Sequence, residues 1–227
     1  MDGRLMQTGL AVMARYPRIG EGKTRLARAI GAEPAYRLYR AFLRDIDLRF
    51  ARGRRTLIWA FHPPDADFAA LTDCSSRCLP QQGDDLGARM RHCFQTLCDE
   101  GFEPVIMIGA DVPHVCEEWL DETESALREA DLVLGPTDDG GYYLIAMRAP
   151  HDVFSGIPMG TNRVLAETLS KAAAASLRVH LLPCSFDVDE ESDLRQLWEL
   201  VRRDRCGLQL PHTEAVLAEV LGDGVAK

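Results

Sequence analysis

A ten-residue run near the middle of the chain places the strongest constraint on its fold. It reads Pro-Val-Ile-Met-Ile-Gly-Ala-Asp-Val-Pro over residues 104–113, so apolar and small residues lead directly to one carboxylate, Asp111. A continuous apolar run bounded by Pro and Gly predicts a central strand that is buried on both faces of a parallel sheet. Pro113 cannot continue the hydrogen-bonded ladder, which places Asp111 at the carboxyl end of that strand.

This position of Asp111 indicates a ligand site. In open α/β sheets ligands bind just beyond the carboxyl ends of the strands, so a lone charge there is expected at the site rather than in the core. A carboxylate suits a hard divalent cation, Mg²⁺ or Mn²⁺, which would bridge to nucleotide phosphates. The alternative is that Asp111 only caps the following helix, which is expected over residues 114–130.

The length and charge of the chain limit the classes of function. With 227 residues and 46% hydrophobic content, the chain can bury a sizeable core, and a single domain over residues 1–227 is the simplest count. A formal charge of −9 argues against nucleic acid or an anionic membrane as the main partner. Neither a signal peptide nor a membrane-length apolar segment is visible, so a cytoplasmic location is expected.

Positive charge is nevertheless concentrated just after the first expected strand, residues 9–14. The loop that follows contains Gly20 and Gly22 and opens a helix, an order that directs backbone amides and a helix N-terminus at an anion. Its cations, opposed only by Glu21, are Arg15, Arg18, Lys23, Arg25 and Arg28. We interpret the loop as a clamp for a di- or triphosphate, with a solvated basic loop as the alternative. A P-loop is disfavoured because Pro17 stands where that motif needs glycine.

Regular elements are expected along the rest of the chain. The predicted strands are residues 56–61, 131–136 and 178–183, together with a strand after the turn at 137–141. The predicted helices are residues 34–50, one with the apolar face Leu86, Met90, Phe94 and Leu97, residues 161–175 with Thr161 as N-cap, one that carries Leu197 and Val201, and residues 213–221. Arg89, beside the glycine loop that opens the second of these helices, is a candidate ligand contact.

Two further acidic segments contribute candidate site residues. Asp139, Gly140 and Gly141 form a tight turn before Tyr142 and Tyr143, whose rings could wall a sugar or base pocket. A plain hairpin turn is the alternative. Near residue 190 five acids lie within seven positions, and those at the start of the helix are explained by its macrodipole. Asp187 and Asp189 precede that helix and could complete a metal site with Asp111.

Four ordered motifs resemble a known family. They are Arg15-x-Pro17 with Gly22-Lys23-Thr24-Arg25-Leu26, Gly109-x-Asp111-x-Pro113, Gly135-Pro136-x-x-Asp139-Gly140-Gly141-Tyr142-Tyr143-Leu144, and Asp187-Val188-Asp189-x-x-x-Asp193-Leu194. Together they span residues 10–200 and resemble a bacterial family of nucleotide-diphospho-sugar transferases with a GT-A-like fold. The wider superfamily is similar to the molybdenum-cofactor and phospholactate guanylyltransferases. The resemblance implies a three-layer α/β/α Rossmann-like fold with a mostly parallel sheet.

The resemblance also implies roles for individual residues. Arg15, Lys23 and Arg25 would bind the nucleotide phosphates. The residues themselves add Gly22 and Arg89 as candidate nucleotide contacts, and Gly140, Gly141 and Tyr142 as candidate substrate contacts. Asp111 and Asp189, or Asp187 in place of Asp189, would hold Mg²⁺ or Mn²⁺. Lys23 would stabilise charge on the leaving group, and Asp139 would orient or deprotonate an acceptor hydroxyl.

The activity implied is a metal-dependent transfer of a glycosyl group from a nucleotide sugar to an unknown small-molecule acceptor. The first alternative is nucleotidyl transfer, which joins a nucleoside triphosphate to a phosphorylated small molecule and releases pyrophosphate. A non-catalytic nucleotide-binding module is an alternative of another class. Two positions depart from the family pattern: Pro113 replaces the second acid that glycosyltransferases carry at the metal strand, and Met159 stands where the family often has Trp.

Overall fold

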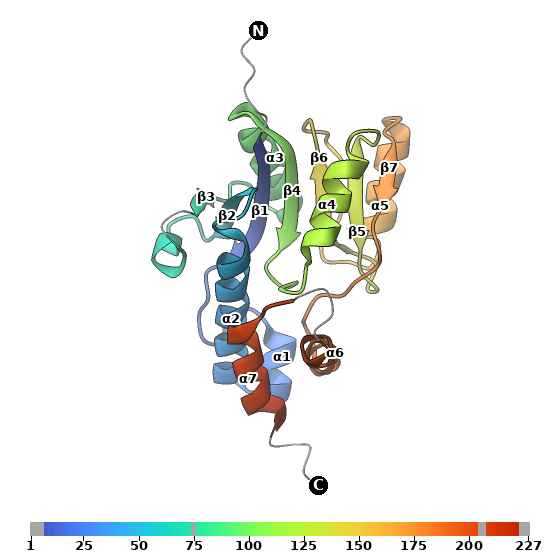
Figure 1. Ribbon diagram of the computed structural model, residues 1–227. Coiled ribbons are helices and arrows are strands. Elements are labelled where there is room, and N and C mark those ends of the chain that lie inside the picture. Colours follow the sequence, from blue (N-terminus) through green and yellow to red (C-terminus); the bar gives the residue numbers. More distant parts are fainter. Residues whose placement is uncertain (1–6, 74–75, 204–207, 223–227) are drawn as a thin grey trace.

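The computed structural model of the protein describes residues 7–73, 76–203 and 208–222. A seven-stranded sheet with the order β3-β2-β1-β4-β6-β5-β7 forms its centre (Figure 1). The strands are β1 (Gln7–Arg15), β2 (Thr56–His62), β3 (Arg77–Pro80), β4 (Phe102–Gly109), β5 (Leu132–Pro136), β6 (Tyr142–Met147) and β7 (Val179–Leu181). β4 corresponds to the strand that the apolar run at residues 104–113 predicted. It is the fourth of the seven strands in the sheet order, as expected for a central strand.

The sheet is mostly parallel. β4 pairs in parallel with β1, which pairs in parallel with β2, and Val12 of β1 faces Ile108 of β4 in the register. β6 is antiparallel to both of its neighbours, β4 and β5. The turn between β5 and β6 is thus a hairpin connection, closed by a hydrogen bond from the Thr137 amide to the Gly141 carbonyl at 3.1 Å.

The helices largely follow the predicted pattern, with corrected ends. They are α1 (Thr24–Ile30), α2 (Ala32–Phe50), the 3-10 helix η1 (Phe68–Leu71), α3 (Leu86–Asp99), α4 (Glu117–Ala126), α5 (Val164–Ala174), α6 (Glu191–Arg202) and α7 (Pro211–Gly222). α4 begins at Glu117 with Cys116 as its N-cap, so Asp111 lies outside the helix and does not cap it. α5 begins three residues after Thr161, and its N-cap is Arg163.

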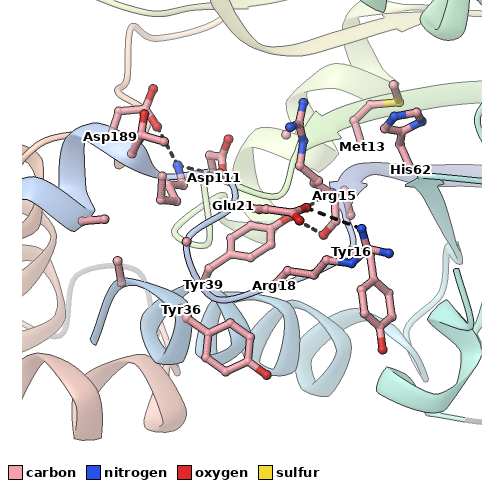
Figure 2. A pocket seen from close by; sticks show the side chains of 18 of the residues that line it. Met13, Arg15, Tyr16, Arg18, Glu21, Tyr36, Tyr39, His62, Asp111 and Asp189 are labelled. Atoms are coloured by element: carbon pink, nitrogen blue, oxygen red, sulfur yellow. Dashed lines mark hydrogen bonds and ion pairs between the residues drawn. The ribbon is translucent and has the colours of Figure 1, made fainter. Parts of the chain in front are cut away.

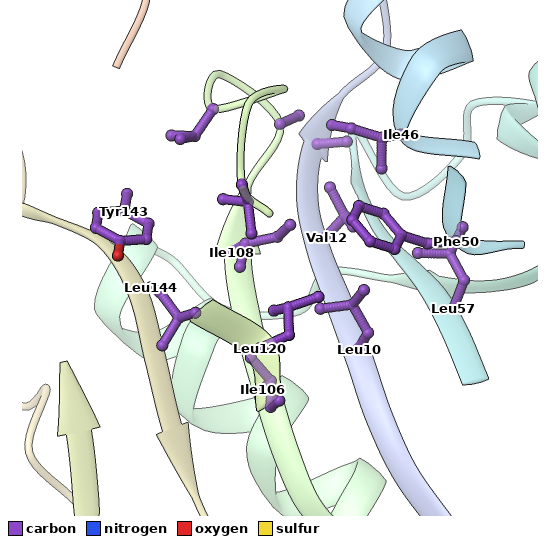
Figure 3. Close-up of a cluster of buried hydrophobic side chains, with 14 of the residues drawn as sticks. Leu10, Val12, Ile46, Phe50, Leu57, Ile106, Ile108, Leu120, Tyr143 and Leu144 are labelled. Atoms are coloured by element: carbon purple, nitrogen blue, oxygen red, sulfur yellow. The ribbon is translucent and has the colours of Figure 1, made fainter. Parts of the chain in front are cut away.

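Two apolar clusters hold helices against the two faces of the sheet. On one face, Val12 and Ile108 of the sheet pack with Ile46 of α2 and Leu120 of α4 (Figure 3). On the other face, Phe94 of α3 and Ala172 of α5 belong to a second cluster, which includes Ala11, Met107 and Ile145. Burial of these side chains on both faces of the sheet produces the expected three-layer α/β/α architecture.

A third apolar cluster lies beyond the carboxyl ends of β1 and β4, where α1, α6 and α7 gather around the start of α2 (Figure 1). It joins Leu26 of α1, Leu38 of α2, Leu197 of α6 and Leu217 of α7, each at most 1% exposed. The helices that begin next to Lys23 and Asp189 therefore share one core. Within the described ranges, no helix combines the length and the apolar character needed to span a bilayer.

Candidate functional site

The loop between β1 and α1 has a backbone that few residue types adopt. Gly20 and Gly22 have φ angles of +80° and +70°, and Lys23 itself is left-handed at φ 43° and ψ 36°. A left-handed conformation is costly for a residue with a side chain, so interactions of the side chain must maintain it. Lys23 is also the N-cap of α1, which places it at the positive end of that helix.

The Lys23 side chain turns into the protein and binds two carboxylates. Its ammonium nitrogen lies 2.8 Å from Oδ1 of Asp111 and 2.7 Å from Oδ1 of Asp189, and it donates to the Val188 carbonyl at 2.7 Å. The side chain of Lys23 is only 8% exposed, whereas those of Asp111 and Asp189 are 43% and 46% exposed. Burial by itself would lower the pKa of Lys23, but the two carboxylates outweigh it and raise that pKa, so the side chain stays charged.

The segments that carry the two carboxylates also contact each other. The Val188 amide donates to the Asp111 carbonyl at 3.0 Å, which joins the end of β4 to the segment before α6. Asp193 of α6 accepts hydrogen bonds from the amides of Asp189 and Glu190 at 2.9 and 2.7 Å. Asp193 therefore belongs to the helix cap, as the macrodipole argument predicted, and it fixes the backbone of Asp189.

A cavity of about 570 Å³ opens beside this cluster. In Figure 2, Asp111 and Asp189 lie at one side of it, and Met13 and His62 lie at the other. Its wall also includes Arg15, Tyr16, Arg18, Gly20, Glu21, Gly22, Lys23, Thr24, Tyr36, Tyr39, Gln81, Leu86, Arg89 and Gly109. A volume in this range is typical of small-molecule sites, and the glycine loop forms part of the wall of this cavity.

Tyr39 of α2 holds the start of this loop. Its hydroxyl accepts from the Arg15 amide at 2.9 Å and donates to the Arg15 carbonyl at 3.0 Å. Burial, and secondly the negative charge of Asp111, raise the pKa of Tyr39. The phenol therefore stays neutral and keeps both hydrogen bonds, which fix Arg15 at the edge of the cavity.

The predicted nucleotide-binding residues divide between the cavity and the surface. Arg15, Gly22, Lys23 and Arg89 line the cavity, and Nε of Arg89 donates to the Gly83 carbonyl at 3.0 Å. Arg25 does not line it: this side chain is 70% exposed and faces Glu190 at 3.4 Å. Leu86, expected on the buried face of α3, is 44% exposed and borders the cavity instead.

The turn between β5 and β6 lies outside the lining of this cavity. Asp139 accepts from the Thr137 hydroxyl at 2.6 Å and from the Gly141 amide at 3.0 Å. Gly140 has a φ of +87°, and a Cβ there would meet the Asn162 carbonyl at 2.1 Å. This close approach requires glycine at position 140 for packing against another loop.

The rings of Tyr142 and Tyr143 do not form one wall. Successive residues of a strand face opposite sides of a sheet. Tyr142 packs in the cluster beneath α3 and α5, and Tyr143 packs on the other face, 5.1 Å from the ring of Trp119. A shared aromatic pocket is therefore not the arrangement that β6 presents, and the contact of Tyr142 with substrate stays a prediction.

Asp187 lies in a strongly acidic environment. Burial, followed by repulsion from Asp139, Asp189 and Asp111, raises its pKa to about 6, and only Lys23 opposes this shift. Asp139 is thus close enough to Asp187 to raise its pKa, although Asp139 lies outside the cavity lining. Lys23 contacts Asp111 and Asp189, while the choice between Asp187 and Asp189 as a metal ligand stays a prediction.

The chemistry of Asp111 and Asp189 fits a hard divalent cation. One nitrogen contacts an oxygen of each, so a single cation can contact both, and the half-exposed side chains leave room for other ligands. Mg²⁺ commonly takes one or two carboxylates and completes its shell with water and substrate phosphates. Across the described ranges, no three His, Cys, Asp or Glu side chains are grouped so as to hold a metal. The residues suit a cation shared with a bound nucleotide.

Sequence reasoning did not identify several residues of this region. Tyr36, Tyr39, His62 and Gln81 line the cavity, but none of them belongs to a motif that the sequence analysis identified. The Gln81 side-chain amide donates to the Ala60 carbonyl at 2.7 Å. Gln81 directly follows β3, a four-residue strand without alternation, so little in the sequence marked its position.

Comparisons with known proteins agree with this fold. A relative from Chloroflexus aggregans, named phosphoenolpyruvate guanylyltransferase, is 28% identical over 197 residues, which cover 83% of this chain and 95% of that protein. A crystal structure from Desulfovibrio desulfuricans, titled as a putative nucleotide-diphospho-sugar transferase, is 34% identical with a TM-score of 0.85 and covers 95% of each chain. The 4-diphosphocytidyl-2C-methyl-D-erythritol synthase of Anaerococcus prevotii, 13% identical with a TM-score of 0.56 over 87% of this chain and 97% of that one, shares the fold.

A family model matches the middle of the chain. It covers residues 47–161, just over half of the sequence, and describes an uncharacterized protein conserved in bacteria, DUF2064. The matched part contains β4, Asp111 and the turn at Gly140, but not Lys23 or Asp189. The chain belongs to the DUF2064 family of bacterial proteins.

Proposed function

We propose that this protein is a metal-dependent nucleotidyltransferase, which joins a nucleoside triphosphate to a phosphorylated small molecule and releases pyrophosphate. The observation that carries the proposal is the contact of Lys23 with both Asp111 and Asp189 at the side of a 570 Å³ cavity that follows a glycine loop. Cationic and anionic groups from distant parts of the chain meet there, as binding of a magnesium-bridged triphosphate requires.

A named relative supports this reaction class. The Chloroflexus aggregans relative is named phosphoenolpyruvate guanylyltransferase, which is a nucleotidyltransferase, whereas the name of the Desulfovibrio desulfuricans protein does not distinguish the two reactions. Pro113 stands where glycosyltransferases carry a second acid, and Asp189 supplies a carboxylate from another segment instead. The guanylyltransferase name of this relative and the proline at position 113 both favour nucleotidyl transfer as the reaction of this site.

The residues of the cavity have separate roles in this proposal. In the reaction an acceptor phosphate oxygen bonds to the α-phosphorus of the nucleotide, and the bond to pyrophosphate breaks. Arg15, Lys23 and Arg89 bind and orient the phosphates and nucleotide, and Lys23 balances charge that develops on the leaving pyrophosphate. A divalent cation on Asp111 and Asp189 would neutralise phosphate charge. Positioning and charge neutralisation together account for most of the expected rate.

Glycosyl transfer is the second candidate, and the acidic side of the site favours it. Asp187 is close enough to Asp139 and to Asp111 for both charges to raise its pKa, and Asp139 and Asp187 lie outside the cavity lining. A hydroxyl acceptor must lose a proton during glycosyl transfer, which a carboxylate can accept, whereas an ionised phosphate acceptor needs no base. Asp139 would then orient or deprotonate the acceptor hydroxyl.

The products distinguish the two reactions. The protein is incubated with Mg²⁺, each nucleoside triphosphate and a set of phosphorylated small molecules, including phosphoenolpyruvate, and in parallel with nucleotide sugars and hydroxyl acceptors. Pyrophosphate indicates nucleotidyl transfer, and free nucleoside diphosphate indicates glycosyl transfer. Asp111→Asn is the control that should abolish either product. Calorimetric binding of nucleotide without any product would contradict both and indicate a non-catalytic binding module.

A further inference from the structure

The two carboxylates that meet at Lys23 belong to segments without regular secondary structure. Residues 111–116 connect β4 to α4, and residues 184–189 lead into α6, with only a single bridge at Ser185. Because neither segment forms a helix or an extended strand, their separation depends on contacts between them. Besides the hydrogen bond from the Val188 amide, those contacts centre on one side chain, His114.

His114 connects the two segments through both its edge and its face. Its Nε2 shares a hydrogen bond of 2.9 Å with Oγ of Ser185, and its ring stacks on Phe186 with centroids 4.4 Å apart. The ring of Trp119 in α4 lies edge-on to the His114 ring, with the two centroids 6.4 Å apart. His114 is 4% exposed and Ser185 is 7% exposed, so water does not compete for this hydrogen bond.

Each segment is also anchored on its outer side. Arg49 of α2 donates from its guanidinium to the carbonyls of Pro113 and Val115, which holds the His114 segment against α2. On the other side, the Ser185 amide donates to the Pro136 carbonyl at 3.0 Å, and the Asp138 amide donates to the Ser185 carbonyl at 3.3 Å. The His114–Ser185 hydrogen bond therefore joins two supported segments, one of which carries Asp111 and the other Asp189.

A histidine at position 114 lowers the stability of the folded protein relative to an apolar ring. Its Nδ1 is buried and has no hydrogen-bond partner within the described parts of the chain. An unsatisfied buried nitrogen lowers stability, and an apolar ring could stack on Phe186 without that cost. What histidine adds over such a ring is the hydrogen bond to Ser185, four residues before Asp189.

We propose that His114 is a positioning residue that sets the separation of Asp111 and Asp189, so that both carboxylates can hold one divalent cation. This inference rests on the metal site of the proposed function. His114 itself touches neither carboxylate: it acts through Ser185 and Phe186 on one side and through its own backbone, three residues after Asp111, on the other.

The test compares metal binding with stability in variants of the full chain. His114→Phe keeps a ring in the stack but removes both nitrogens, and Ser185→Ala removes only the hydroxyl. Mn²⁺ binding is measured by electron paramagnetic resonance, alone and with a non-hydrolysable GTP analogue, and thermal unfolding is measured in parallel. We expect each variant to weaken Mn²⁺ binding about tenfold, in the range found when partners of metal ligands are removed. The double variant should bind no more weakly than either single one.

Asp45→Asn is the matched control for loss of stability. Asp45 is buried in α2 and accepts hydrogen bonds from the amides of His212 and Thr213, which join α2 to α7, so this variant should melt earlier but bind Mn²⁺ as the wild type does. If His114→Phe and Ser185→Ala change the melting temperature but not Mn²⁺ binding, the inference is overturned and the proposed function stands. If the wild type itself fails to bind Mn²⁺ with the nucleotide, the metal site of the proposed function is contradicted, together with this inference.

Discussion

Lys23 places its ammonium nitrogen 2.7 Å from Oδ1 of Asp189, a residue 166 positions further along the chain. The same nitrogen contacts Asp111, so it occupies the place between two carboxylates where a metal ion would be attracted. Lysine and a divalent cation therefore compete for the same oxygen atoms until a nucleotide supplies phosphates that can bind the ammonium. A substitution that removes the ammonium should therefore strengthen the binding of a metal ion alone and weaken the binding of a nucleotide.

Replacement of Lys23 by Met should separate metal binding from nucleotide binding. Without the ammonium, Asp111 and Asp189 carry unbalanced charge, so Mn²⁺ alone should bind more tightly than it does to the wild type. Nucleotide binding should weaken by about tenfold or more, because a charge-assisted contact with phosphate is lost. Calorimetry with each ligand separately measures both effects. Unchanged or weaker Mn²⁺ binding would show that the ammonium and the metal do not compete, and unchanged or tighter nucleotide binding would show that the ammonium does not contact phosphate.

Asp111→Asn and Asp189→Asn should both abolish turnover while the protein stays folded. Asparagine keeps the shape of the side chain but removes the charge that attracts a cation, and we expect kcat to fall by about 100-fold or more. Each variant leaves the buried Lys23 ammonium its other carboxylate and the Val188 carbonyl, so we expect the free energy of unfolding to fall by about 1–3 kcal/mol while the protein stays folded. The rate of product formation measures the expected loss of kcat, and unfolding in urea measures the change in stability. Arg25→Gln is the control, because Arg25 lies outside the cavity lining. A variant with full turnover would remove that carboxylate from the metal site.

Gly140→Ala should destabilise the protein much more than Gly156→Ala. Both glycines have a positive φ, +87° and +74°, so alanine introduces similar backbone strain of about 1–2 kcal/mol at each. At position 140 the added Cβ would also meet the Asn162 carbonyl at 2.1 Å, whereas at position 156 nothing lies within 4 Å. We expect a further loss of roughly 2 kcal/mol in the free energy of unfolding for Gly140→Ala, measured in urea. Equal losses would contradict the close packing of the two loops.

The stability of the protein should fall in acid partly because of His114. Burial, and secondly the charge of Arg49, lower the pKa of this imidazole to about 3, compared with about 6.5 in the unfolded chain. The unfolded state therefore binds more protons between these values, and stability decreases as the pH falls from 6.5 towards 3. Each pH unit in this window corresponds to at most about 1.4 kcal/mol. His114→Phe should show a shallower slope there and the same slope above pH 7; parallel curves would contradict a neutral buried histidine.

The sequence predicted the central strand and the position of Asp111 for clear physical reasons. Only a strand buried on both faces tolerates the apolar run that β4 contains, and Pro113 marks its end. The glycine loop was equally visible, because Gly20 and Gly22 adopt the positive φ angles that favour glycine. Lys23, Asp111 and Asp189 could each be named from the sequence, since each stands where a strand or helix begins or ends.

Other features depend on tertiary contacts that no local pattern records. The insertion of antiparallel β6 between β4 and β5 is a matter of topology, which the apolar pattern of each strand leaves open. Arg25 turns to Glu190 rather than to the cavity, a choice set by the docking of α6. The contacts of His114 join residues 71 positions apart and give no periodic signal. The opposite directions of Tyr142 and Tyr143, by contrast, could have been read from strand alternation alone.

The meeting of Lys23 with Asp189 also has a consequence for biosynthesis. The ribosome synthesises the glycine loop with Lys23 early and Asp189 late. Most of the chain must therefore be translated before Lys23 can contact Asp189. Nascent chains that stop before Asp189 can pair the strands from β1 to β7, but they lack half of the anionic pair. A series of stalled chains of increasing length should therefore acquire protease resistance in the sheet well before they acquire affinity for nucleotide.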